Sequence, residues 1–304
     1  MIKFKPIWFD EVMDIFDNKI PYSAFDEYLK CRPGILENID IFMPNCRSEG
    51  QPSDFSLFQL DEENPDVIVI SLYLELLMYH NHNDDIVKCI QYFSNKYKDK
   101  IVVFFWNHDA DFAPLNEEIL SFKNVRILNY NTSNKSPNDI ILPFWTMNTT
   151  EYKEPKLCKY GFYGSTENHK IRVRLVQHFV TNSDFRYRGG LSEEIYLRMS
   201  SETIFNFCPR GAGLSSWRFF ESMHLNTIPV LFADDTVLPF EDSLDYSKIC
   251  VRLPEDDTNS DVVIMEKLES VDINAMLEQI NLHKSKFTLL GAQTETHDKL
   301  IAAI

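Results

Sequence analysis

Short apolar runs separated by amphipathic segments are the feature that most constrains the fold of this chain. Residues 67–72 (VIVISL) and 101–106 (IVVFFW) are rich in β-branched and aromatic side chains. Such runs are typical of strands that are buried on both faces of a parallel sheet. Between them, residues 84–97 begin with acidic side chains and place Ile86 and Ile90 at helical spacing. A strand, a helix and a strand in this order predict a βαβ unit, and therefore an α/β fold.

The same alternation extends through the remainder of the chain. Further strands are expected at 125–128, 139–142, 160–163, 204–208 and 228–232, and helices at 170–180, 215–225 and within 274–304. The 304 residues suffice for two cores, and linker-like composition near residue 150 separates them. We therefore predict two stacked α/β domains, residues 1–150 and 151–304, with a cleft between them. Ligands are expected at the carboxyl ends of the strands, and the terminal helix can pack back on the first domain.

The charge of the chain restricts its partners. Its formal net charge is -16 and its pI is near 4.9, which argues against a broad basic face for nucleic acid or an anionic membrane. The first twenty residues contain no uninterrupted apolar segment of signal-peptide length, and the apolar stretch 67–79 is too short to be a transmembrane anchor. The six cysteines show no metal-binding spacing, so we expect reduced thiols, a cytoplasmic protein and no metal.

The segment after the expected strand 204–208 has the composition of an anion site. Of the 9 glycines in the chain, six lie between residues 161 and 213, where they allow a backbone to approach a ligand closely. Arg210 and Gly211 lead into a helix that Ser215 or Ser216 can cap. The start of this helix and the charges of Arg210 and Arg218 suit a diphosphate. A capped surface helix with solvated arginines is the alternative interpretation.

Glu221 follows Arg218 by three residues and shares its helical face, within an otherwise apolar run. A carboxylate at this position can accept hydrogen bonds from the two ribose hydroxyls of a nucleotide. A surface ion pair between Arg218 and Glu221 explains the same spacing without a ligand.

Several motifs in this order resemble the exostosin-like family of glycosyltransferases. The similarity extends over about residues 138–256. It rests on residues 138–143 (NDIILP), 162–165 (FYGS), 171–175 (IRVRL), 208–211 (CPRG), 216–221 (SWRFFE), 227–230 (TIPV), 238–240 (LPF) and 244–247 (LDYS).

The resemblance implies a GT-B enzyme with two Rossmann-like domains. Such an enzyme transfers a sugar from a nucleotide diphosphate donor, typically UDP, to a glycan acceptor with inversion. The donor would lie in the C-terminal domain, and the N-terminal domain would hold the acceptor. Familiar members carry a membrane anchor, so a chain without one is expected to be a soluble bacterial or viral member in the cytoplasm of a bacterial cell or infected host.

The resemblance also implies roles for individual residues of the donor site. Arg210 and Arg218 would hold the diphosphate together with Gly211 and the helix start at Ser215 and Ser216. Glu221 would bind the ribose. Arg172 would reach the phosphates from the turn at Gly164.

The general base is expected after the strand 101–106. The loop there contains His108, Asp109 and Asp111, and Asp109 is the first choice because it follows the carboxyl end of a buried strand. The arginines would stabilise the leaving diphosphate without a cofactor. Asp109-Ala110-Asp111 also matches the D-x-D pattern that coordinates Mn²⁺ or Mg²⁺ in a second glycosyltransferase fold. A catalytically inactive module that binds a nucleotide or a glycan is the third alternative.

Overall fold

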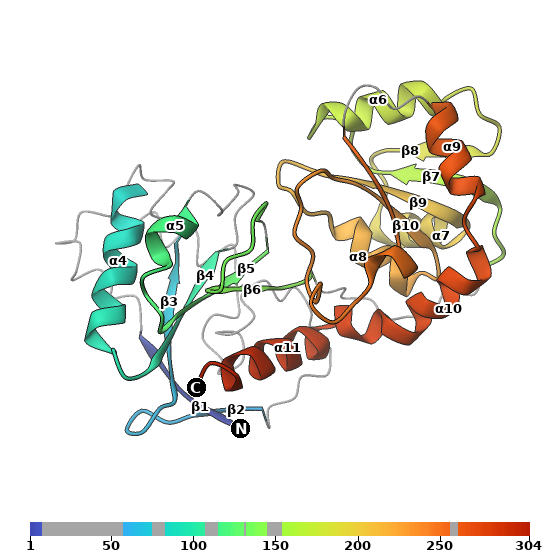
Figure 1. Cartoon of the computed structure of the whole chain (residues 1–304). Coiled ribbons are helices and arrows are strands. Elements are labelled where there is room, and N and C mark those ends of the chain that lie inside the picture. The colour runs from blue at the N-terminus through green and yellow to red at the C-terminus, as the bar shows by residue number, and fades with distance from the viewer. Residues whose placement is uncertain (8–56, 75–82, 107–114, 131, 145–153, 256–260) are drawn as a thin grey trace. The chain divides into compact units, whose positions relative to one another are not determined.

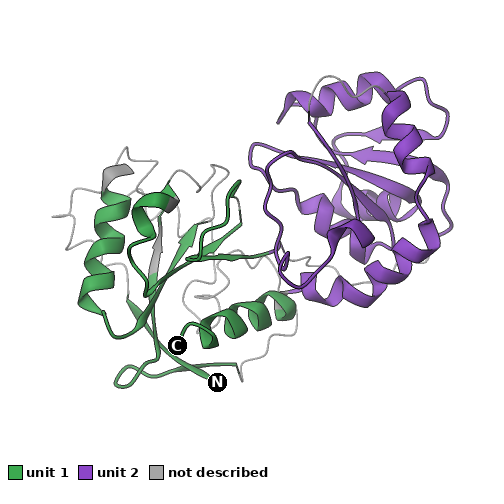
Figure 2. Cartoon of the chain, in the orientation of Figure 1, with its two compact units in different colours: residues 1–142, 289–304 green, residues 143–288 purple. Residues whose placement is uncertain are grey.

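The chain forms two compact α/β units (Figure 2). The computed structural model describes residues 1–7, 57–74, 83–106, 115–130, 132–144, 154–255 and 261–304. Unit 1 comprises residues 1–142 and 289–304, and unit 2 comprises residues 143–288. The boundary that the sequence predicts at residue 150 lies outside the described residues. Among the helices that are described, none has the length and apolar character needed to cross a bilayer.

Unit 1 is built on a six-stranded parallel sheet of order β2-β1-β3-β4-β5-β6 (Figure 1). Its strands are β1 (Ile2–Ile7), β2 (Phe58–Leu60), β3 (Val67–Tyr73), β4 (Ile101–Trp106), β5 (Val125–Asn129) and β6 (Asp139–Ile141). Its helices are α4 (Asn83–Lys96), α5 (Asn116–Ile119) and α11 (Leu289–Ile301).

The apolar runs of the sequence form the centre of the unit 1 sheet. All six residues of β4 are buried, which confirms the predicted strand at 101–106. The α4 helix packs on this strand through Phe93, whose ring lies 6.3 Å from that of Phe104. The terminal helix α11 packs on the edge strand β2, where the ring of His297 lies 5.9 Å from that of Phe58.

Unit 2 is a five-stranded parallel sheet of order β11-β10-β9-β7-β8 (Figure 1). Its strands are β7 (Cys158–Tyr163), β8 (Phe185–Arg188), β9 (Thr203–Pro209), β10 (Ile228–Phe232) and β11 (Val251–Leu253). Its helices are α6 (Lys170–Phe179), α7 (Glu193–Ser201), α8 (Trp217–His224), η3 (Tyr246–Lys248), α9 (Asp261–Glu269), α10 (Ile273–His283) and η4 (Lys284–Phe287). Two parallel α/β sheets confirm the predicted α/β fold with two Rossmann-like units.

Alternate side chains of β9 fix the helices that cover its two faces. Phe207 packs on Phe179 of α6, with ring centroids 5.0 Å apart. The neighbouring Asn206 points the other way, and its amide donates to Ser222 Oγ of α8 at 2.9 Å. Because side chains alternate along a strand, α6 and α8 lie on opposite faces of the unit 2 sheet (Figure 1).

The strand order of unit 2 reverses between β7 and β9. The chain leaves β7 toward β8 at one edge and then returns past β7 to β9 on the other side. Loops that leave the carboxyl ends of two such strands diverge, and the crevice between them is where open α/β sheets bind ligands. The loop after β7 begins at Gly164, and the loop after β9 begins at Arg210. Gly164 and Arg210, two of the predicted donor residues, therefore lie at the topological switch point of unit 2.

Candidate functional site

Arg218 extends from the first turn of α8 across the carboxyl end of β7. Its Nε donates to the carbonyl oxygen of Tyr163 at 2.5 Å, and its guanidinium lies 5.6 Å from the ring centroid of Phe162. Its Nη1 and Nη2 donate no hydrogen bond to the described residues. Arg218 is thus held in place by one nitrogen and keeps its outer fork available for an anion.

Gly164 provides the space that Arg218 occupies. A Cβ atom added at Gly164 would lie 2.0 Å from Nη2 and 2.6 Å from Cζ of Arg218, and the φ of this glycine is +157°. A larger residue would therefore displace the guanidinium. The sequence singled out Gly164 as a turn, and the structure shows what the absence of its side chain permits.

Arg172 joins the loops after β7 and β9. The residue is only 4% exposed. Its Nε donates to the carbonyl of Arg210 at 2.8 Å, and its Nη1 donates to the carbonyl of Ser165 at 3.0 Å. Burial, and then the nearby charge of Arg218, lowers the pKa of Arg172 to about 10. Because these hydrogen bonds direct the Arg172 guanidinium at backbone carbonyls, its contact with a phosphate stays a prediction.

The side chain of Arg210 folds back on the loop that carries it. Its Nε donates to the carbonyl of Gly213 at 3.2 Å and its Nη2 to that of Ala212 at 3.3 Å. Glu255, which follows β11, lies 4.0 Å from Arg210 Nε. Burial raises the pKa of Glu255, and the Arg210 charge opposes this shift. Gly211 keeps the same loop close to Arg172, since a Cβ there would lie 3.3 Å from Arg172 Nη2.

The start of α8 leaves hydrogen-bond donors unused. Ser216 is the N-cap residue, with φ -139° and ψ 127°, but its side chain makes no capping hydrogen bond. The backbone N–H groups of Trp217 and Arg218 also find no acceptor among the described residues. Trp217 stacks on Phe144 with ring centroids 4.8 Å apart, so this turn is anchored by packing. Unused N–H groups and the positive end of the helix dipole favour an anion here. Ser215 lies half-exposed just before the cap.

Glu221 lies one turn further along α8 and is held by a residue that the sequence did not indicate. The hydroxyl of Tyr196, in α7, donates to Glu221 Oε2 at 2.5 Å. Burial raises the pKa of Glu221, while the Tyr196 hydrogen bond and the Arg218 charge oppose this shift. Neither the polarity nor the helical spacing of Tyr196 distinguishes it in the sequence.

His169 also belongs to this cluster without having been predicted. Its Nδ1 accepts the backbone N–H of Ile171 at 3.4 Å and caps α6. Burial lowers the pKa of His169, and the charge of Arg210 lowers it further. A polar residue directly before the predicted helix at 170–180 was the available signal. The loops after β7 and β9 thus place a neutral imidazole beside several guanidinium groups.

The residues predicted to act as the general base, His108, Asp109 and Asp111, lie outside the described residues. Across the ranges that the structure describes, no three His, Cys, Asp or Glu side chains gather as a metal site would require. The base and the alternative D-x-D metal site therefore stay predictions.

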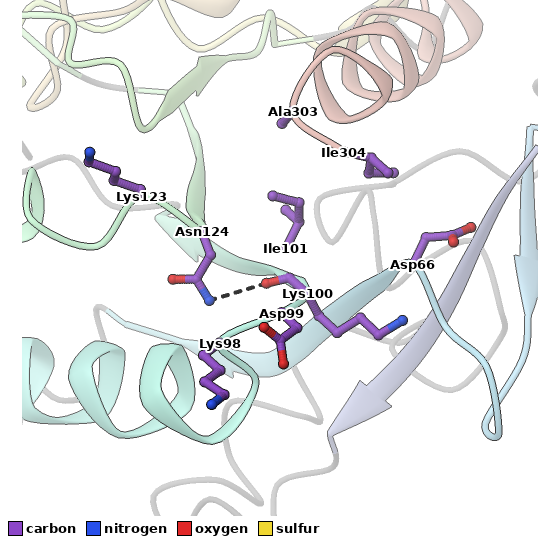
Figure 3. Close-up of a pocket in the computed structure, with 9 residues that line it drawn as sticks. All are labelled: Asp66, Lys98, Asp99, Lys100, Ile101, Lys123, Asn124, Ala303 and Ile304. Carbon is purple, nitrogen blue, oxygen red and sulfur yellow. Dashed lines mark hydrogen bonds between the residues drawn. The ribbon is translucent and has the colours of Figure 1, made fainter.

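A pocket of about 310 Å³ lies elsewhere, at the amino-terminal edge of the unit 1 sheet (Figure 3). It is lined by Asp66, residues 98–101, Lys123, Asn124, Ala303 and Ile304. Within this lining, the Asn124 amide donates to the carbonyl of Lys100 at 3.1 Å (Figure 3). The lysines Lys98 and Lys123 are exposed and point in different directions (Figure 3). None of the predicted site residues lines this pocket, so it is not part of the candidate site.

More than half of the chain matches the model of a known protein family. The family model for the exostosin GT47 domain matches residues 101–268. A probable glucuronosyltransferase of Oryza sativa subsp. japonica is 29% identical over 131 residues, which cover 41% of this chain and 28% of that protein. A probable glucuronoxylan glucuronosyltransferase of Arabidopsis thaliana is 31% identical over 138 residues, covering 44% and 27%.

An exostosin-1 homolog of Caenorhabditis elegans is 31% identical over 65 residues, which cover 21% of this chain and 17% of the homolog. The chain thus spans less than a third of the length of these relatives. Among solved structures, the GtfA/B complex aligns with a TM-score of 0.48 at 11% identity, covering 78% of this chain and 57% of that one. WaaG, a glycosyltransferase involved in lipopolysaccharide biosynthesis, aligns with a TM-score of 0.39 at 9% identity, covering 82% and 88%.

Proposed function

Since the chain belongs to the exostosin GT47 family, we propose that it is an inverting glycosyltransferase. It moves a sugar from a nucleoside diphosphate, with UDP as the expected nucleotide, to a hydroxyl group of a glycan acceptor. Several relatives are named glucuronosyltransferases, so UDP-glucuronic acid is the first donor to test.

One observation carries this proposal: three kinds of group that can bind a nucleoside diphosphate, namely guanidinium groups, backbone N–H groups and a carboxylate, lie near the switch point of unit 2. Nη1 and Nη2 of Arg218 find no acceptor among the described residues, and Arg210 lies on the adjacent loop. Within the same part of the chain, backbone N–H groups at the start of α8 are unused, and Glu221 follows on the same helix. Guanidinium groups and a helix start match the charge of a diphosphate, and a carboxylate matches the hydroxyls of a ribose.

The proposed reaction is a displacement at the anomeric carbon. The acceptor oxygen forms the new bond to this carbon, the bond to the donor phosphate oxygen breaks, and the nucleoside diphosphate leaves with both electrons. The acceptor proton passes to a general base, for which Asp109 is the proposal, with His108 and Asp111 as alternatives. Arg210 and Arg218 stabilise the charge that develops on the leaving diphosphate, so no metal is required.

Calorimetric titration of UDP tests the donor site directly. Replacing Arg210 and Arg218 together by alanine is expected to weaken UDP binding by about 100-fold or more, because each charge-assisted contact contributes about 1.5–3 kcal/mol. The matched control replaces Lys98 and Lys123 by alanine, which removes the same net charge from unit 1 and should leave the affinity within about twofold. Equal weakening in both variants would overturn the site.

Turnover of UDP-glucuronic acid and UDP-N-acetylglucosamine, with and without EDTA, tests the chemistry. Release of UDP that is insensitive to EDTA and falls about 100-fold or more in Asp109→Asn supports the proposal. Loss of turnover in EDTA, with recovery on adding Mn²⁺ or Mg²⁺, would favour the metal site at Asp109 and Asp111 instead. UDP binding without any turnover would identify a binding module.

A further inference from the structure

A hydrogen bond between two neighbouring helices fixes the orientation of Glu221. The α7 and α8 helices follow β8 and β9, so both helices begin at the carboxyl edge of the unit 2 sheet. Tyr196 lies in the first turn of α7, and its hydroxyl donates to Glu221 Oε2 at 2.5 Å. Arg218, one turn before Glu221, is held by the Tyr163 carbonyl. The carboxylate is thus constrained by a hydrogen bond from α7 and lies within the influence of the Arg218 charge on its own helix.

The two oxygens of Glu221 have different surroundings. Oε2 accepts the Tyr196 hydroxyl, whereas Oε1 accepts no hydrogen bond from the described residues and is absent from their buried, unpaired side-chain atoms. A carboxylate can accept about four hydrogen bonds. Oε1 therefore stays accessible with its full accepting capacity, beside the anion-binding start of α8.

We propose that Tyr196 is a positioning residue that orients Glu221 for the ribose of the donor and so sets the preference for ribonucleotides over 2′-deoxyribonucleotides. This inference rests on the proposed function. Tyr196 itself does not contact the donor. It acts by holding Oε2, which leaves Oε1 at a fixed position for the ribose hydroxyl groups, and a site built to bind a hydroxyl discriminates strongly against a ligand that lacks it.

The charge state of Glu221 provides a readout that a purely structural tyrosine would not affect. Burial raises the pKa of Glu221 and the Tyr196 hydrogen bond lowers it. The other groups that face this pair are Arg218 from α8, whose charge lowers the Glu221 pKa, Glu193 from α7, which raises it, and the buried Cys208 thiol of β9. Removing the Tyr196 hydroxyl is therefore expected to raise the Glu221 pKa further. UDP binding would then be lost at a higher pH on acidification.

The experiment compares UDP with 2′-deoxy-UDP by calorimetry on the full chain, from pH 5 to pH 8. The wild-type protein is expected to prefer UDP by about tenfold or more at pH 7.5, which corresponds to about 1.4 kcal/mol. Tyr196→Phe is expected to reduce this ratio to about three or less and to shift the acid limb of UDP binding upward. Tyr196→His, which keeps a ring donor, should restore part of the ratio.

Tyr246→Phe is the matched control. The Tyr246 hydroxyl donates to the carbonyl of Pro239 at 2.7 Å in the same unit, so each substitution removes one phenolic hydrogen bond. The control should lose a similar amount of thermal stability and keep the wild-type ratio. If Tyr196→Phe folds and keeps the ratio and the acid limb, or if both variants lose the ratio equally, the positioning role is wrong.

The two proposals fail in different ways. A wild-type protein that does not bind UDP at millimolar concentration would reject the proposed function, and this inference with it. A wild-type protein that binds UDP and 2′-deoxy-UDP equally would reject only the ribose preference. If neither Tyr196 variant folds, a UDP preference in the wild-type protein that stays constant over the pH range where Glu221 protonates overturns the inference.

Discussion

Two groups of basic side chains, one in each unit, differ in how they are held. In unit 2, Arg172, Arg210 and Arg218 each donate to backbone carbonyls at the carboxyl edge of the sheet. In unit 1, Lys98 and Lys123 line a pocket at the amino-terminal edge, and their side chains form no hydrogen bond or ion pair with the residues that the structure describes. Hydrogen bonds within the fold therefore orient the arginine side chains of unit 2. No hydrogen bond to a described residue orients the side chains of Lys98 and Lys123 in unit 1.

The difference shows that the fixed orientation of the basic side chains, more than their charge, distinguishes a candidate binding site. Ordering a long basic side chain costs conformational entropy, and a bound ligand must offset this cost when the free protein has not already done so. The carbonyls of Tyr163, Ser165 and Arg210 order the guanidinium groups during folding. The lysines of the unit 1 pocket would have to be ordered by the ligand itself.

The largest effect that the comparison predicts is a loss of stability in Arg172→Leu. This change leaves the carbonyls of Ser165, Pro209 and Arg210 without their donor at a residue that is 4% exposed. The expected loss is about 3 kcal/mol in the free energy of unfolding, measured by urea denaturation. Lys100→Leu should change the stability by less than about 0.5 kcal/mol. A similar small change for Arg172→Leu would show that its carbonyl contacts are not what orders the two loops.

A smaller effect, on affinity, is expected for Gly164→Ala. The new methyl group would occupy the position of the Arg218 guanidinium and move it from its site. UDP affinity should fall about tenfold, equivalent to about 1.4 kcal/mol, by calorimetric titration.

Gly190→Ala is the control that separates the loss of UDP affinity from the effect of backbone strain. Gly190 has φ +64°, and no atom of the described residues lies within 4 Å of an added Cβ, so alanine there should cost about 1 kcal/mol of stability without a change in affinity. Unchanged UDP affinity in Gly164→Ala would contradict the assigned place of Arg218.

The smallest effect is expected at His169. Burial, followed by the charge of Arg210, lowers its pKa below the ordinary value. Because a bound diphosphate would neutralise neighbouring guanidinium charges, UDP should raise the His169 pKa. The shift is measurable by NMR titration of the ring protons with and without UDP. The pKa of His224 is lowered by burial and then by the charge of Lys284, so it should not respond. A His169 pKa that stays constant would place the bound anion elsewhere.

Much of the strand and helix pattern could be read from the sequence. Residues 101–106 and 228–232 coincide with β4 and β10, and the predicted helix at 170–180 ends one residue beyond α6. These segments are fully buried or strongly amphipathic, so their hydrophobic period is unambiguous. The strands β1 and β8 were not predicted. Their sequences IKFKPI and FRYR mix basic and apolar residues, and the partners that make them strands lie far away in the sequence.

The candidate site also contains residues that the sequence could predict and residues that it could not. Arg210, Arg218 and Glu221 lie within one short segment, so their spacing and their helix could be recognised locally. Tyr196 precedes Glu221 by 25 positions on another helix, and its hydroxyl contributes only after the two helices have packed on one sheet.

By itself, the sequence determined the α/β class, the segment that carries the basic residues and the start of the helix behind it, because all of these depend on residues close in the chain. Only the tertiary structure decided which donors stay free. Arg172 donates to backbone carbonyls, whereas Nη1 and Nη2 of Arg218 have no acceptor in the part of the chain that the structure describes, and Tyr196 donates to one oxygen of Glu221. The physical reason is that hydrogen-bond partners are assigned by proximity in space, and the strand order places distant segments together at one edge of the sheet.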